Sequence, residues 1–224
     1  MSLKECAVQA LFRHPETTAA WEYLSSFAYP WEALDGLKEE ILRLGDALSE
    51  EEYCRIAPDV WVAKTAVVAP SAQLCGPLIV GPYSEIRHCA FVRGSALIGR
   101  GCVVGNSTEL KNCILFDGVQ VPHYNYVGDS ILGYRAHLGA GAITSNVKGD
   151  RGEVTVRVGD VRLKTGRRKC GAMVGDGAEV GCHAVLNPGS VLGVNCRVYP
   201  LALVRGYVES ACILKSGGEQ VRME

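Results

Sequence analysis

Apolar residues recur at every sixth position from Ile56 onward, a spacing that neither a helix nor an ordinary strand produces. Residues four positions after each apolar one are mostly small, such as Ala66, Ala72 and Ala90. The count resumes at Leu132 and continues from Val174 to Val204, so an internal repeat covers most of the chain. The first run comprises Ile56, Val62, Val68, Leu74, Val80, Ile86, Val92, Ile98, Val104, Leu110 and Phe116.

This pattern predicts a mainly β fold, a parallel β-helix in which each hexad supplies one short strand and a turn. Three hexads close a coil of 18 residues, and the inward aliphatic side chains stack about 4.8 Å apart from coil to coil. About twenty hexads give roughly seven coils, which bury a core only by stacking. The pattern resembles the left-handed hexapeptide-repeat family, an exception to the right-handed crossover rule. An amphipathic helical bundle is disfavoured by the glycine, proline and β-branched content of the hexads.

Residues 1–55 have a different, helical pattern. Apolar residues between Trp31 and Leu48 recur at intervals of three or four, and Pro30 stands at the expected helix start. We expect an N-terminal helical cap that covers a hydrophobic end of the main domain. The main domain is predicted to span residues 56–210, with a C-terminal tail at 211–224.

The repeat is lost between Asn146 and Val174, where an insert at residues 147–173 is predicted. Within it, EVTVRV and VRLKT alternate apolar and polar residues around Gly159-Asp160, the pattern of a β-hairpin. The hairpin is followed by the basic run Arg167, Arg168 and Lys169. That run is either a solvated turn or a contact for an anion.

Charge and composition argue against several classes of protein, namely nucleic-acid-binding, membrane-bound and metal-binding proteins. The 23 Lys and Arg against 24 Asp and Glu predict no general attraction to nucleic acid or to a membrane surface. No apolar run of about 18 residues and no leader sequence is present, so we expect a cytoplasmic protein. The ten cysteines contain no CxxC pair, which predicts reduced structural thiols and no metal site.

The residue after each inward aliphatic is expected to face outward, and in most hexads it is Ala or Gly. Charged exceptions cluster between residues 86 and 123: Arg87, Arg93, Lys111, Asp117 and His123. On an 18-residue coil, His123 shares an edge with Arg87, and Lys111 stacks beside Arg93. Such a cluster is often only a solvated face. The step from Pro122 to Leu132 is ten residues rather than twelve, however, which predicts a distorted coil beside His123.

Two glycines flank Ala140, where they permit close approach of a ligand to backbone N–H groups. Outward residues of a β-helix form a pocket only against another surface. We therefore expect a homotrimer, whose three-fold symmetry supplies that surface.

Four segments resemble, in order and spacing, the acetyltransferase domain of the bifunctional UDP-N-acetylglucosamine pyrophosphorylase/glucosamine-1-phosphate N-acetyltransferase family. They read VGPYSEIRH, VGNSTELKN, VPHYNYVGDSILGYRAHLGAGAITSN and VGDGAEVGC. The GRRKCGAMVGDG stretch is more similar to archaeal-type and firmicute relatives. The resemblance implies transfer of an acetyl group from acetyl-CoA to the amine of an amino-sugar phosphate, glucosamine 1-phosphate. The first 55 residues hold no glycine-rich nucleotide loop, so we expect no pyrophosphorylase activity.

The resemblance also implies roles for individual residues. The catalytic histidine of the family matches His123, which would accept the proton of the attacking amine. Ala140 lies where a backbone N–H faces the thioester carbonyl, and Asn146 matches an asparagine that contacts substrate and cofactor. The implied substrate-binding residues are Arg87, Lys111, Tyr126 and, in place of an asparagine, His137. Cys182 takes the place of a serine near the coenzyme, and Val147 begins a loop that differs from the family.

Two other functions remain open from the sequence. A zinc hydratase of the same fold would use His88, His123 and His137 as metal ligands. A non-catalytic module would bind a sugar phosphate or support assembly, with its N-terminal helices reserved for a partner. Zinc content separates the first from the others, and turnover separates the remaining two.

Overall fold

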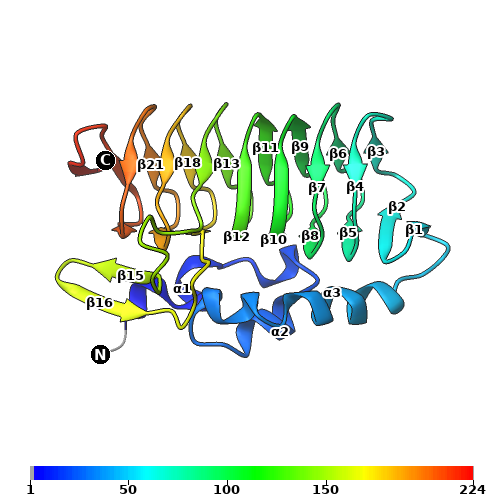
Figure 1. Ribbon diagram of the computed structural model, residues 1–224, viewed down its shortest axis with the longest axis horizontal. Coiled ribbons are helices and arrows are strands. Elements are labelled where there is room, and N and C mark those ends of the chain that lie inside the picture. The colour runs from blue at the N-terminus through cyan, green and yellow to red at the C-terminus, as the bar shows by residue number, and fades with distance from the viewer. Residues whose placement is uncertain (1–2, 224) are drawn as a thin grey trace.

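The computed structural model describes residues 3–223 and confirms a left-handed parallel β-helix with an N-terminal helical segment and a β-hairpin insert (Figure 1). The coils form three faces. The covered face holds β2 (Val60–Ala63), β5 (Leu78–Val80), β8 (Ala96–Ile98), β17 (Ala172–Val174), β20 (Ser190–Leu192) and β23 (Tyr207–Val208). The open face holds β4 (Gln73–Leu74), β7 (Phe91–Val92), β14 (Ile143–Thr144), β19 (Val185–Leu186) and β22 (Leu203–Val204).

The third face, named here the His137 face, carries parallel strands from β3 to β24. Its strands are β3 (Val67–Val68), β6 (Glu85–Ile86), β9 (Val103–Asn106), β11 (Gln120–His123), β13 (His137–Leu138), β18 (Glu179–Val180), β21 (Arg197–Val198) and β24 (Cys212–Leu214). The long strands β10 (Glu109–Leu115) and β12 (Tyr126–Leu132) begin on the open face and end on the covered face.

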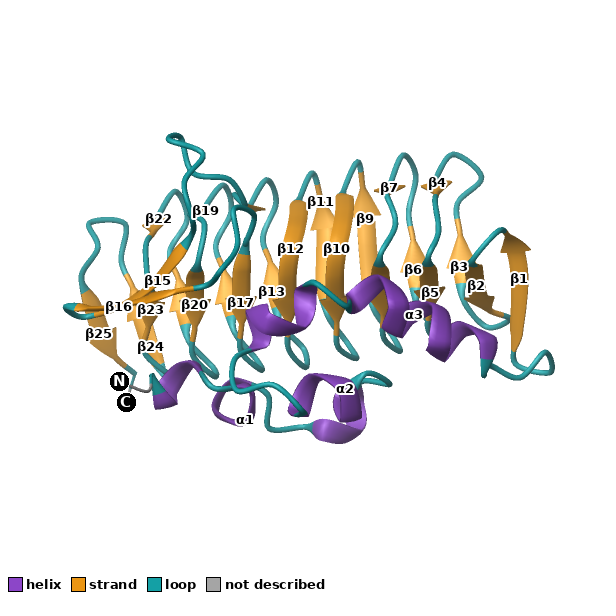
Figure 2. Cartoon of the chain, turned by 60° about the horizontal axis from the view of Figure 1, so that its bottom comes forward, coloured by secondary structure: helices purple, strands orange, loops and turns teal. Residues whose placement is uncertain are grey.

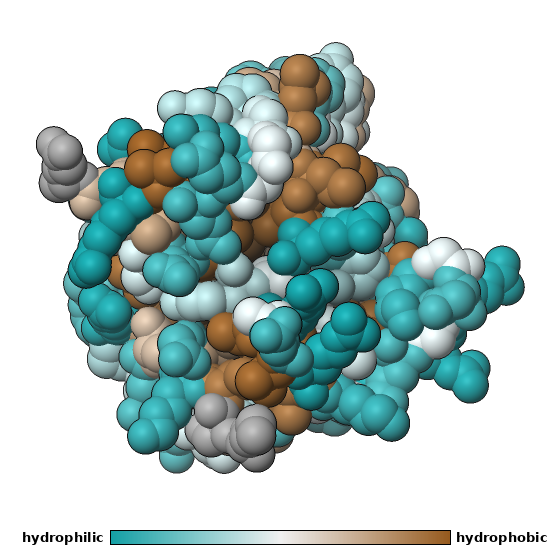
Figure 3. Space-filling view, turned by 90° about the vertical axis from the view of Figure 1, so that its left-hand side faces the viewer, coloured by the Kyte–Doolittle hydropathy of each residue, from teal (hydrophilic) through white to brown (hydrophobic). Residues whose placement is uncertain are grey.

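Both ends of the solenoid carry an antiparallel strand. At the first end, β1 (Tyr53–Ala57) pairs with β2, and Ile56, the expected first inward residue, is instead 56% exposed. At the other end, β25 (Gln220–Arg222) pairs with β24, which itself stacks in parallel on β21. The stacking therefore continues past residue 210, into the segment expected to be a tail. Hydrophilic side chains cover most of this end, with apolar patches between them (Figure 3).

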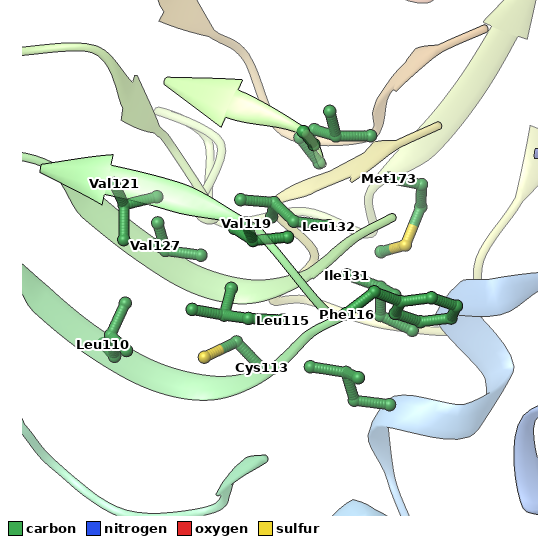
Figure 4. Close-up of a cluster of buried hydrophobic side chains, with 14 of the residues drawn as sticks. Leu110, Cys113, Leu115, Phe116, Val119, Val121, Val127, Ile131, Leu132 and Met173 are labelled. Atoms are coloured by element: carbon green, nitrogen blue, oxygen red, sulfur yellow. The ribbon is translucent and has the colours of Figure 1, made fainter. Parts of the chain in front are cut away.

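Two coils in the middle of the solenoid contain 17 residues rather than 18. Val104 pairs with Val121, and Gln120 pairs with His137. The repeat was expected to lose two residues in one step, between Pro122 and Leu132. It instead loses one residue at each of two corners, at Asn112 and at Asp129. The inward series on this stretch is Leu110, Leu115, Val121, Val127 and Leu132, all fully buried (Figure 4).

The two shortened corners lie within continuous strands. Strands β10 and β12 each run through a corner in which one residue, Asn112 or Asp129, takes the left-handed conformation, with φ of 50° and 48°. Asn and Asp tolerate that conformation better than other non-glycine residues. Phe116, expected to point inward, instead stacks on Phe12 of the N-terminal segment, with 4.9 Å between ring centroids.

The N-terminal segment lies along the covered face, rather than over an end of the solenoid as expected (Figures 1 and 2). It comprises η1 (Lys4–Cys6), α1 (Val8–Leu11), η2 (Pro15–Thr17), α2 (Trp21–Ser25), η3 (Pro30–Leu34) and α3 (Leu37–Asp46). None of the helices in residues 3–223 is long and apolar enough to cross a membrane.

The covered face explains why helices pack there. The middle residue of its strands faces outward and is apolar and buried, as in Ile79, Leu97, Ile114, Ile131, Met173 and Val191. Buried Asp176 fixes the segment to the solenoid, because its carboxylate accepts hydrogen bonds from the backbone N–H groups of Arg13 (2.6 Å) and Tyr134 (2.8 Å).

The insert leaves and rejoins the solenoid at a narrow neck. Val147 bridges Lys169, and the Cys170 N–H donates to the Asn146 carbonyl at 3.0 Å. Its hairpin is formed by β15 (Thr155–Val158) and β16 (Val161–Lys164), as expected. Arg167 is only 11% exposed and forms an ion pair with Asp35, so part of the basic run joins the insert to the N-terminal segment.

Candidate functional site

Three of the predicted site residues, His123, Ala140 and Cys182, lie in successive coils at the same corner of the solenoid. This corner joins the His137 face to the open face. The Gly141 N–H donates to the His123 carbonyl at 2.9 Å, and the His183 N–H donates to the Ala140 carbonyl at 2.8 Å. In the next coil, the Leu201 N–H donates to the Cys182 carbonyl at 2.9 Å. With about 4.8 Å between coils, His123 and Cys182 lie roughly 10 Å apart, with Ala140 between them.

The backbone of His123 is fixed by Asn125, a residue that the sequence analysis did not identify. Asn125 is 3% exposed, and its Nδ2 donates to the carbonyls of Gly139 (2.8 Å) and Ala142 (2.9 Å). Its Oδ1 accepts the His123 N–H at 3.1 Å. The imidazole itself is exposed, so it is presented to solvent from a rigid corner.

Ala140 is flanked by peptide groups that are already used by the solenoid. The Gly139 N–H donates to the Val180 carbonyl at 2.7 Å, and the Gly141 N–H donates to His123. Within residues 3–223, the Ala140 N–H donates to no acceptor. It is therefore a donor available to a ligand in the column that contains His123.

A second cluster surrounds Asp129, whose side chain is buried and which the sequence analysis also missed. Its carboxylate accepts hydrogen bonds from Lys111 Nζ at 2.9 Å, Asn112 Nδ2 at 2.8 Å and Asn146 Nδ2 at 2.5 Å. Asn146 Nδ2 also donates to Tyr126 Oη at 3.1 Å. Three of the predicted site residues, Lys111, Tyr126 and Asn146, thus meet at one carboxylate.

Tyr126 begins the strand that follows the His123 corner. Burial, together with the nearby carboxylates of Asp129 and Glu109, raises the pKa of its phenol. Gly128 makes room for this ring, because a Cβ at that position would lie 2.4 Å from Tyr126 Oη. The phenol is consequently held as a neutral hydrogen-bonding group beside Asn146.

The register of the shortened coils changes which residues of the predicted charge cluster stack on one another. The Ser107 N–H donates to the His88 carbonyl, and the Tyr124 N–H donates to the Asn106 carbonyl. His123 therefore shares its column with His88, not with Arg87 as expected from an 18-residue coil. His88 and His123 lie two coils, roughly 10 Å, apart.

Each predicted cation of the cluster has a carboxylate partner. Arg87 pairs with Glu85 at 3.0 Å, and Arg93 pairs with Glu109 at 2.8 Å. Lys111 stacks beside Arg93, as the spacing predicted, but lies at the far side of the open face from the Arg87 corner. A single chain does not bring Arg87 and Lys111 to one point.

His137 lies apart from this corner. It pairs with Gln120 at the beginning of β11, whereas His123 ends that strand. Its Nδ1 is 2.9 Å from Glu179 Oε2. Within the part of the chain that the structure describes, no group of three or more His, Cys, Asp or Glu side chains could hold a metal ion.

Several known proteins are similar to this chain in sequence. A family model described as the GMPPB C-terminal domain matches residues 74–167. A bifunctional sugar-1-phosphate nucleotidylyltransferase/acetyltransferase from Sulfurisphaera tokodaii is 30% identical over 193 residues, which cover 84% of this chain and 48% of the relative. A bifunctional protein GlmU from Methanococcus maripaludis is 30% identical over 184 residues, which cover 79% of this chain and 44% of the relative. The chain is a homologue of these bifunctional GlmU-type proteins.

The chain spans about half the length of the curated relatives that it matches. Among solved structures, it is similar to the acetyltransferase domain of PglB from Neisseria gonorrhoeae in complex with acetyl coenzyme A. That likeness has a TM-score of 0.34 and 15% sequence identity, and covers 71% of this chain and 55% of the other.

Proposed function

We propose that this chain is a CoA-dependent N-acetyltransferase that acts on an amino-sugar phosphate, with glucosamine 1-phosphate as the substrate and acetyl-CoA as the donor. The observation that carries the proposal is the corner on which His123, Ala140 and Cys182 lie in successive coils, with Tyr126 reaching from this side across the open face to Asn146. The name of the Sulfurisphaera tokodaii relative, which combines nucleotidylyltransferase and acetyltransferase, supports it.

In the proposed reaction, the sugar amine attacks the carbonyl carbon of the thioester. His123 accepts the proton that the amine loses, since a neutral amine is needed as the nucleophile. The unused Ala140 N–H donates to the oxygen that becomes negative in the tetrahedral intermediate. When the intermediate collapses, the carbon–sulfur bond breaks and CoA leaves as the thiol after taking up a proton.

The remaining site residues are proposed to bind the sugar, its phosphate and the coenzyme. Tyr126 and Asn146 contact the sugar, with His137 as a further sugar contact and Cys182 along the coenzyme. Arg87 and Lys111 bind the phosphate in exchange for their present partners, Glu85 and Asp129. Because these two cations are separated in one chain, the proposal includes a homotrimer, in which one chain's corner meets a neighbour's open face.

The test follows thiol release from acetyl-CoA in the presence of glucosamine 1-phosphate. His123→Ala is expected to lower kcat by roughly 100-fold to 10,000-fold, the usual contribution of a positioned general base. His88→Ala, in the same column two coils away, is the matched control and is expected to keep full activity.

Two results would contradict the proposal. Equal activity of His123→Ala and the wild type would remove His123 from the reaction. Lack of turnover by the wild type over a panel of amino-sugar phosphates would favour the non-catalytic module instead, which binding of the same sugar phosphates would then test.

A further inference from the structure

The hairpin insert encloses a second site, separate from the His123 corner. A cavity of about 610 Å³ lies between the hairpin, the loop at residues 147–150 and the solenoid corner at Asn187, Pro188 and Arg205. Ligand pockets usually measure about 300–1,000 Å³, so this volume suits a small molecule. Neither His123 nor Cys182 lines the cavity, although Ser145 and Val147, on either side of Asn146, do.

The cavity is strongly cationic. Lys148, Arg157, Arg162 and Arg205 line it, and Asp150 is the acidic residue of its lining. Lys148 pairs with Asp150 at 3.1 Å. Among residues 3–223, the three arginines form no ion pair with a carboxylate. The lining therefore keeps a surplus of positive charge that the protein does not neutralise.

Two of these arginines stand directly opposite each other in the hairpin. Arg157 of β15 pairs with Arg162 of β16, so both side chains project from the same face of the ribbon. Like charges in directly opposed positions destabilise a strand pair. An anion bound between the two guanidinium groups would turn this repulsion into attraction.

The hairpin is held in place rather than projecting freely. Its opposite face is apolar: Val156 is fully buried, and Leu163 packs against the core. Figure 2 shows β15 passing over β20 and β23, with which it makes contact. A Cβ at Gly189 or Gly206 would lie 2.8 Å from the Thr155 carbonyl oxygen or 2.6 Å from that of Arg157. These glycines let the ribbon approach the corner closely, which fixes Arg157 at the cavity.

We propose that this cavity binds the diphosphate portion of a nucleotide-containing ligand, with Arg157 and Arg162 making forked contacts to phosphate oxygens. Arg205 approaches the same anion from the solenoid. Two sources carry this chemistry: coenzyme A, which also has a 3′-phosphate, and a nucleoside diphosphate sugar. None of its cations takes part in the proposed acetyl transfer; the coenzyme A source rests on that proposed function, and the nucleotide-sugar source does not.

The first experiment measures binding of inorganic pyrophosphate to the full chain by calorimetry. The double variant Arg157→Ala/Arg162→Ala is expected to weaken binding by about tenfold or more, as loss of charge-assisted hydrogen bonds implies. Lys164→Ala/Arg168→Ala, which removes two exposed cations from the same insert but none from the cavity lining, is the matched control and should bind as the wild type does. If the double variant unfolds, Arg205→Ala serves in its place and should also weaken binding.

Competition then identifies the source of the phosphates. Displacement of pyrophosphate by coenzyme A, and less well by dephospho-coenzyme A, would assign the cavity to the coenzyme. Displacement by UDP-glucose and not by coenzyme A would assign it to a nucleotide sugar. The proposal is overturned if pyrophosphate does not bind the wild type, if both arginine variants bind it unchanged, or if neither nucleotide displaces it. His123→Ala should bind pyrophosphate normally, so this result is independent of the catalytic test.

Discussion

At the scale of the residue, Asp129 organises much of the candidate site. A buried carboxylate is costly unless its oxygens accept hydrogen bonds, and here Lys111, Asn112 and Asn146 satisfy them. The carboxylate in turn holds the Asn146 amide within reach of Tyr126. A change at Asp129 should therefore affect both stability and the position of two proposed substrate contacts.

We expect Asp129→Ala to lower the free energy of unfolding by about 1–3 kcal/mol, because its half-buried donors lose their charged acceptor. Glu109→Ala, which removes the partly exposed partner of Arg93, is expected to cost less than about 1 kcal/mol. Denaturant unfolding monitored by circular dichroism measures both. Similar losses for the two variants would show that the Asp129 cluster contributes no more than a surface ion pair.

Sequence reasoning proposed His123, Tyr126 and Asn146 through their resemblance to a family, but it did not single out Asn125 and Asp129. Both act through hydrogen bonds across coils, and the partners of such bonds depend on the register. The assumed 18-residue coil gives the wrong register here, and for the same reason it placed His123 in the Arg87 column. The signal that was present is the pair of polar residues, Asn112 and Asp129, separated by 17 residues at successive corners.

At the scale of the element, the strands of the covered face differ from the others because they are apolar on both sides. Leu78 and Val80 point inward while Ile79 between them points outward, and all three are buried. A continuous apolar run of this kind indicates a strand that is covered on both faces. Since these runs recur at every third hexad, the sequence contained the position at which the N-terminal helices pack. Counting only the inward residue of each hexad overlooked this signal, because it ignores the outward residue between them.

Two outward isoleucines on neighbouring coils test this difference between faces. Ile131, on the covered face, is fully buried, whereas Ile143, on the open face, is partly exposed. Ile131→Ala should lower the free energy of unfolding by about 2–5 kcal/mol, the usual cost of a truncated core side chain. Ile143→Ala should cost clearly less, since it leaves no enclosed cavity. Equal costs by denaturant titration would show that the N-terminal segment does not bury this face in solution.

At the scale of the whole molecule, the covered face and the N-terminal segment form one core, and this coupling limits what the sequence could predict. The helical pattern at residues 30–48 correctly indicated helix, yet its apolar stripe could have covered an end or a side. Contacts such as Phe12 with Phe116, and Leu11 with Asp176, are separated by more than one hundred residues. No periodicity in the sequence encodes such long-range contacts.

The cysteines provide a test of this single core. All ten are free thiols, and burial raises the pKa of Cys102, Cys113, Cys170 and Cys196 to about 12. At pH 9 the exposed Cys54, Cys89 and Cys182 should react quickly with iodoacetamide because reagent reaches them, while these four buried thiols stay protected. Mass spectrometry after timed labelling identifies the modified positions.

The same pKa shift predicts the direction of a change in stability. Above pH of about 8.5 the unfolded chain loses thiol protons that the folded chain retains, so the free energy of unfolding should fall as the pH rises from 8 to 10. Replacement of Cys113 with alanine should reduce this slope, because its raised pKa contributes to it. Because Cys113 points into the solenoid, on the side of β10 opposite to Ile114, its labelling should follow the opening of the core. Labelling of Cys113 as fast as that of Cys54 in the native protein would contradict a core that unfolds as one unit.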